Sequence, residues 1–155
     1  MLHKQKETIL AVLKSNKVSK NYERTYWFSY QDFLDPEDNF TSFSCEELDG
    51  KQGYIALIGN LLNADANAKV FVEVYGFEEV NSEPFIYADT LIIFSKLSLS
   101  EVKQIFQEPK DIFPDDIGEV TDLAERSFII GSNGELVPAA NLFSDEVSVY
   151  YCWWD

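Results

Sequence analysis

Segments of apolar, aromatic and β-branched residues predict most of the strands. Residues 22–30 alternate aromatic with mixed positions, and 70–75 alternate valines with other residues. Residues 85–94 and 146–155 have the same strand-forming composition. The run 53–59 is almost continuously apolar, which is typical of a central strand covered on both faces, although periodicity alone leaves a buried helix open.

Helical periodicity marks two other segments. Residues 2–15 gather their apolar side chains on one side, which predicts an amphipathic opening helix. Ser98 and Glu101 form a capping-box pattern that predicts a helix over 99–107, and Pro109 ends it because proline has no amide hydrogen and clashes with the preceding turn.

Turn-forming residues separate these elements. Residues 35–39 and 63–67 are polar turns, and 131–134 contain the Asn and Gly that favour a tight hairpin between short strands at 128–130 and 136–137. No linker or repeat divides the chain. The sequence therefore predicts a single α+β domain over residues 1–155, with a mainly antiparallel sheet of about five to seven strands and two or three covering helices.

The net charge of the chain excludes some classes of ligand. The 155 residues carry 27 acidic and 12 basic side chains, a net charge of −15. Residues 1–24 hold six basic and two acidic residues, a net +4, so −19 falls on the remainder. Nucleic acid and anionic membranes are therefore excluded as direct ligands, because phosphate neutralisation needs clustered cations. With no apolar stretch of membrane-spanning length and no signal sequence, we expect a cytoplasmic protein.

Little in the sequence supports catalysis. The single histidine, His3, lies near a terminus, and common nucleophile, phosphate-binding and zinc motifs are absent. Cys45 and Cys152 are expected to be reduced thiols packed as small apolar residues. We therefore expect a protein that is not an enzyme and needs no cofactor or metal. A carboxylate-based hydrolase stays as an alternative, because two acids can catalyse glycoside hydrolysis.

Clustered acidic residues predict a surface for a basic protein partner, because complementary charge accelerates encounter. One acidic turn spans residues 32–38, a second loop spans 78–84, and a third acidic segment spans 111–122. Aromatic residues of the final strand that face outward could become buried in the interface with the partner and add affinity. The alternative is that a helix, such as 2–15, packs over these aromatic residues. The predicted contact residues are Glu78, Glu79, Glu83, Asp111, Asp115, Asp116, Glu119, Asp122, Tyr150 and Trp154. The segment 111–122 could also hold calcium or magnesium, but its spacing differs from a calcium-binding loop.

The acidic profile and the aromatic ending at residues 150–154 resemble the immunity proteins of polymorphic toxin and contact-dependent growth-inhibition systems. The resemblance implies a cytoplasmic inhibitor whose carboxylates occupy the basic active-site cleft of a cognate toxin domain, often a nuclease. It would act as a monomer or weak homodimer. The alternative is a structural component, in which the basic first helix docks on the acidic body of another copy to build a homo-oligomer.

Overall fold

The computed structural model describes residues 7, 9–11, 14, 25–34, 41–43, 51–80, 83–107, 114–120, 127–131, 135–142 and 144–154. For residues 25, 41–43, 51, 75–80 and 83–87 it describes the backbone alone. Within the predicted opening helix 2–15, residues 7, 9–11 and 14 are helical and Ile9 is buried; the others lie outside the described residues. The 35–39 turn and Cys45 also lie outside them.

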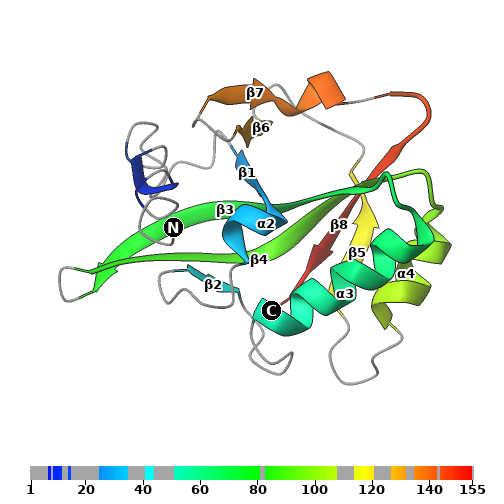
Figure 1. The fold of residues 1–155 in the computed structure, drawn as a ribbon, viewed down its shortest axis with the longest axis horizontal. Helices are drawn as coiled ribbons and strands as arrows, with labels where there is room; N and C mark the ends of the chain where they lie inside the picture. The colour runs from blue at the N-terminus through cyan, green and yellow to red at the C-terminus, as the bar shows by residue number, and fades with distance from the viewer. Residues whose placement is uncertain are drawn as a thin grey trace.

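Strands and helices alternate irregularly along the chain (Figure 1). In order they are β1 (Thr25–Ser29), α2 (Tyr30–Phe33), β2 (Thr41–Phe43), α3 (Lys51–Ala64), β3 (Lys69–Val80), β4 (Glu83–Ser95), α4 (Leu99–Gln107), β5 (Asp116–Glu119), β6 (Ser127–Ile130), β7 (Leu136–Pro138), the 3-10 helix η2 (Ala139–Leu142) and β8 (Ser148–Trp153).

All described strands belong to one mixed sheet. Seven follow the order β5-β8-β4-β3-β1-β6-β7, and β2 pairs with β4 off this path. The β1–β6 and β2–β4 pairs are parallel, and the other pairs are antiparallel. The predicted α+β class with a mainly antiparallel sheet is therefore confirmed.

The main core lies between one face of the sheet and helices α3 and α4, which lie together in Figure 1. From α3, Tyr54 and Ile58 are fully buried, as are Val102 and Phe106 from α4. The sheet contributes alternate residues of its central strands, including Val72, Val74, Leu91, Ile93 and Cys152. Alternation places successive side chains of a strand on opposite faces, so the intervening residues lie on the other side.

A smaller aromatic core occupies that second face. Trp27, Phe71 and Phe94 pack with ring centroids 5.7 to 6.3 Å apart. The buried Ala139 of η2 belongs to this cluster, together with Ile92 and Val149. Both faces of the sheet are thus partly covered, which explains why residues 91–94 of β4 are all apolar.

The predicted central strand at 53–59 is wrong, because these residues lie inside helix α3. Four residues that recur at helical spacing, Tyr54, Leu57, Ile58 and Leu61, face the main core, and Ala56 and Asn60 are exposed. The apolar run of residues 53–59 spans only about two helical turns, and at that length a buried strand and a buried helix have nearly the same apolar pattern.

The prediction of an acidic loop at 78–84 is also wrong for residues 78–80, 83 and 84, which lie in strands β3 and β4. Glu78 and Glu79 pair with Phe85 and Pro84 in the β3–β4 ladder, so both strands run almost to the hairpin tip. The strand pattern was obscured because glutamate has low β-propensity, whereas ladder pairing with β4 determined the conformation. Strand β5 lies in the acidic segment 111–122, where no strand was predicted.

Two local predictions are confirmed. Helix α4 spans Leu99–Gln107, and the Ser98 and Glu101 side chains exchange hydrogen bonds with each other's backbone N–H, at 3.1 and 3.2 Å. β6 and β7 form the predicted antiparallel pair. The tip of that hairpin, residues 132–134, lies outside the described residues.

Candidate functional site

A row of mainly polar and aromatic side chains crosses five strands on the second face of the sheet. The strand registers place Trp27 opposite Glu73, Glu73 opposite Thr90, Thr90 opposite Trp153, and Trp153 opposite Asp116. Residues directly opposite each other in antiparallel strands have their side chains on one face, with Cβ atoms about 5 Å apart. These five residues are called the Trp153 row.

Carboxylates accept hydrogen bonds from both tryptophans of the row. The indole Nε1 of Trp27 donates to Glu73 Oε2 at 2.8 Å, and that of Trp153 donates to Asp89 Oδ2 at 3.1 Å. The Thr90 hydroxyl donates to the other oxygen, Asp89 Oδ1, at 2.8 Å. These bonds hold each indole in one orientation against the sheet.

Asp89 reaches Trp153 because β4 carries a bulge at this point. Glu73 pairs with Thr90 and Val74 pairs with Ala88, which leaves Asp89 as the extra residue. Its backbone carbonyl still accepts from the Trp154 N–H at 3.0 Å. A bulge re-aims the side chain of the extra residue, and bulges are frequent beside functional sites.

Asp116 organises the β5 end of the row. Its Oδ2 accepts a hydrogen bond from the Tyr151 hydroxyl at 2.9 Å. This bond, together with burial and the negative charge of Asp116, raises the pKa of Tyr151. Gly118 makes room for the Tyr151 ring, because a Cβ at position 118 would lie 2.8 Å from its hydroxyl oxygen.

Solvent exposure increases along the row. Trp27 is 2% exposed, Glu73 and Thr90 are half-buried, and Trp153 is 37% exposed. Asp116 is exposed at the end, on the edge strand β5. We call the accessible end of the row, together with the residues bonded to it, the β8–β5 surface; it consists of Asp89, Thr90, Asp116, Tyr151 and Trp153.

Three predicted contact residues lie at this surface or next to it. Asp116 belongs to it, Asp115 precedes β5, and Glu119 ends the strand; all three are exposed. Together with Asp89, Asp116 places a carboxylate beside Trp153, and Asp115 and Glu119 extend the acidic character along β5. Glu119 pairs with the buried Tyr150, so its side chain lies on the opposite face of the sheet from Trp153.

The other acidic predictions do not join this group. Glu78, Glu79 and Glu83 lie at the hairpin end of β3 and β4, which is far from β5 in Figure 1. Along β3, Glu78 is five residues beyond Glu73, which corresponds to roughly 17 Å. Asp111 and Asp122 lie outside the described residues.

The two predicted aromatic anchors are wrong as surface residues. Tyr150 is 3% exposed and donates a 2.6 Å hydrogen bond from its hydroxyl to the Leu97 carbonyl. Trp154 is 2% exposed and contacts Tyr54 of α3 and Phe106 of α4, with ring centroids 5.1 and 6.4 Å away. The alternative prediction was that a helix covers this face of the last strand. Helices α3 and α4 cover it.

The sequence did not single out Asp89, Thr90, Tyr151 and Trp153. The last strand is apolar at nearly every position, so alternation could not show which aromatic residues face solvent. The sequence contains Trp153 and its polar partners, but they lie in different strands. Their proximity can be inferred only when the register of the strands is known.

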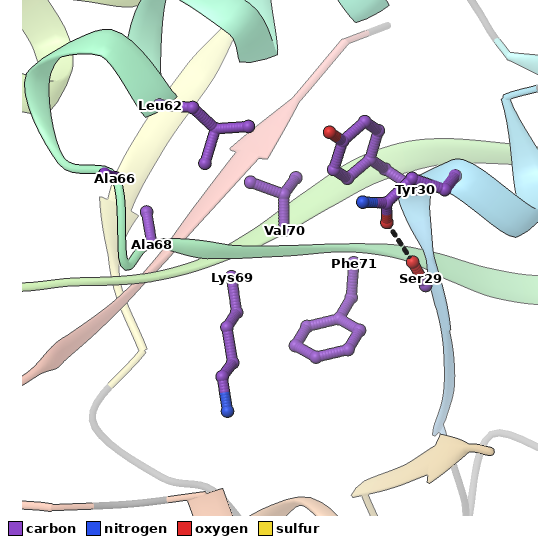
Figure 2. A pocket seen from close by; sticks show the side chains of 9 residues that line it. Ser29, Tyr30, Leu62, Ala66, Ala68, Lys69, Val70 and Phe71 are labelled. Carbon is purple, nitrogen blue, oxygen red and sulfur yellow. Dashed lines mark hydrogen bonds between the residues drawn. The ribbon is translucent and has the colours of Figure 1, made fainter.

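A pocket of about 390 Å³ lies elsewhere, where β1 leaves the sheet (Figure 2). The last β1–β3 pair is Ser29 with Phe71, so Lys69 and Val70 extend beyond β1. In Figure 2, Val70 lies on the same side of β3 as Leu62, and Lys69 and Phe71 extend from the other side. The lining contains no carboxylate, so this pocket does not supply the acid pair that a hydrolase requires.

Other chemistry receives no support from the described part of the chain. Within it, no three His, Cys, Asp or Glu side chains group as metal ligands. Cys152 is fully buried, and burial raises the pKa of its thiol far above the ordinary range, which keeps it protonated. No described helix has the length and apolarity needed to cross a bilayer.

Comparison with protein-family models, curated proteins and solved structures gave no significant match.

Proposed function

We propose that this protein is a non-catalytic inhibitor that binds a basic protein through the β8–β5 surface, in the manner of an immunity protein that blocks a toxin. The observation that carries the proposal is the exposed Trp153 beside Asp89 and Asp116, with Asp115 and Glu119 on the same edge of the sheet. A fixed aromatic side chain with two carboxylates beside it is suited to a cationic partner.

Charge and rigidity have separate roles in this proposal. The net charge of −15 attracts a basic partner from a distance and raises the association rate at low salt. Trp153 and Tyr151 then provide contact area that is already ordered by hydrogen bonds, so little side-chain entropy is lost on binding. The proposal also places this protein in the cytoplasm, because an immunity protein must share a compartment with the toxin that it blocks.

The test begins with affinity capture from the source cells on immobilised full-length protein, at 0.1 M and 0.5 M salt. We expect one basic protein, reduced at high salt because exposed charges are then screened. The captured protein is purified and its activity measured with increasing amounts of this chain. Inhibition that is complete at a 1:1 ratio supports the proposal.

Site-specific evidence comes from association kinetics with that purified partner. Charge reversal at Asp115 and Asp116 should lower the association rate at least about tenfold and flatten its salt dependence. The matched control reverses Asp145 and Glu146, two exposed acids in the turn before β8, and so changes the net charge by the same amount. Equal effects from both variants would place the interface elsewhere. Capture of this chain alone, with a salt-sensitive dimer in light scattering, would favour the homo-oligomer.

A further inference from the structure

We infer that the β8–β5 surface binds an arginine side chain of the basic partner, with the Trp153 indole as its stacking platform and the Asp116 carboxylate as its counter-ion. This inference rests on the proposed function and names the chemical group that the surface recognises.

Trp153 has the exposure and the fixed orientation that a stacking surface for a cation requires. At 37% exposed it is the one large apolar side chain in the described part of the chain that is exposed, while its neighbours Cys152 and Trp154 are buried. Its Nε1–H is bonded to Asp89, so the ring cannot turn its N–H towards a ligand without losing that bond. Hydrogen bonding to a carboxylate also increases electron density on the indole, which strengthens attraction of a cation to the ring face.

Asp116 is placed to receive the charge. It is directly opposite Trp153 across the β8–β5 pair and is exposed. Its Oδ2 accepts from Tyr151, and among the described residues no donor reaches its Oδ1. A carboxylate has about four lone-pair positions, so Asp116 keeps capacity for a guanidinium after bonding Tyr151.

Geometry favours arginine over lysine. A guanidinium is planar, so it can stack on Trp153 and direct its edge N–H groups to an adjacent carboxylate at once. An ammonium group is compact and strongly hydrated, so it gains less from the ring. Trp153 and Asp116 stand side by side on one face, which matches the stack-and-bridge geometry of arginine.

The experiment uses ¹⁵N-labelled full-length protein and three peptide probes at low salt: acetyl-(Gly-Arg)₄-amide, its lysine analogue, and its citrulline analogue, which keeps the shape and loses the charge. The indole N–H resonance of Trp153 is assigned with Trp153→Phe. We expect this resonance to shift saturably with the arginine peptide, with a Kd at least about threefold lower than for the lysine peptide. The citrulline peptide should not produce a saturable shift.

Variants locate the binding. Trp153→Leu and Asp116→Asn should each weaken binding of the arginine peptide about fivefold or more, whereas Asp145→Asn should stay within about twofold. For all variants the affinity is taken from the backbone amide shifts of residues next to the surface, because Trp153→Leu has no indole N–H to follow. Thermal unfolding followed by circular dichroism verifies that each variant is folded. Equal affinity for arginine and lysine peptides, or binding insensitive to Trp153→Leu, would overturn the inference.

The two proposals fail in different ways. If the peptides do not distinguish arginine but partner binding still depends on Asp115 and Asp116, the arginine inference falls and the inhibitor function stands. If the peptides bind at Trp153 as expected but no basic partner is inhibited, the cation preference of the surface stands and the inhibitor function falls.

Discussion

Adjacent tryptophans at the end of β8 have opposite environments. Trp154 lies between α3 and α4 in the main core, whereas Trp153 faces solvent on the other side of the sheet. Strand alternation requires this opposition, because neighbouring side chains point to opposite faces. A contribution to stability is therefore expected from Trp154 and a contribution to binding from Trp153.

Alanine substitutions test that assignment. Trp154→Ala should lower the free energy of unfolding by about 3–5 kcal/mol, because it leaves a large cavity between the helices and the sheet. Trp153→Ala should cost under about 1.5 kcal/mol, since it removes one hydrogen bond and a partly exposed ring. Urea unfolding followed by circular dichroism measures both; similar losses would contradict the assignment.

Asp65 is a buried carboxylate with a structural role. It is 3% exposed, and its oxygens accept from the Ser95 hydroxyl at 2.7 Å and from the Lys96 and Asn67 backbone N–H groups at 3.1 Å. These bonds join the turn after α3 to the turn after β4. Desolvation alone would raise the pKa of Asp65, but the hydrogen bonds and the nearby Lys96 charge outweigh it and lower the pKa.

The lowered pKa of Asp65 predicts how the stability of the fold depends on pH. Because the folded pKa is below the unfolded value, Asp65 stabilises the fold above about pH 4, and the contribution is lost as pH falls through the folded pKa. Asp65→Asn should therefore cost about 1–3 kcal/mol at pH 7, the same down to about pH 4, and progressively less below that pH. Urea unfolding from pH 7 to pH 3 measures this, with Asp145→Asn as the charge-matched control. A gap that is constant with pH would contradict the assigned role.

At the scale of elements, α4 is determined locally and α3 is not. The reciprocal Ser98 and Glu101 bonds begin α4 at the predicted residue, because a capping box satisfies backbone donors without any tertiary contact. In α3 the apolar run is nearly continuous, and Gly53 and Gly59 lower its helix propensity. Packing against the sheet decided that it is a helix.

The cap has a measurable effect. Ser98→Ala removes the side-chain acceptor for the Glu101 N–H and should lower the free energy of unfolding by about 1 kcal/mol. Ser100→Ala, at an exposed position in the first turn of the same helix, is the control and should be neutral or slightly stabilising. Chemical denaturation compares the two, and an equal loss for both would show that the cap contributes nothing.

At the scale of the whole molecule, the sheet is covered by helices on one face and only partly covered on the other. Helices α3 and α4 protect the main core, while η2 covers the Trp27 end of the second face and leaves the Trp153 end accessible. The acidic edge β5 borders this accessible end, so charge and exposed aromatic surface coincide in one place.

The overall charge should also destabilise the folded chain. A net charge of −15 produces self-repulsion that salt screens, since the Debye length falls from about 30 Å at 0.01 M to about 10 Å at 0.1 M. We expect the Tm to rise by roughly 2–4 °C between these salt concentrations, which corresponds to about 1 kcal/mol for a domain of this size. Differential scanning calorimetry measures the change, and a falling Tm would mean that favourable ion pairs dominate.

The sequence by itself determined the class of the fold, the cap and length of α4, the β6–β7 pairing and the strand character of β1, β3, β4 and β8. These features depend on short-range periodicity and capping, which neighbouring residues encode. It also indicated Asp115, Asp116 and Glu119 as acidic positions that reach solvent.

Only the tertiary structure decided which residues form the candidate surface. Tyr150 and Trp154 differ from Tyr151 and Trp153 by a single step along β8, and a one-residue change of face exchanges core for solvent. The Trp153 row gathers residues from five strands that are distant in sequence, and the bulge at Asp89 supplies its hydrogen-bond acceptor. Register and the placement of covering helices arise from long-range packing, which no local pattern in the sequence encodes.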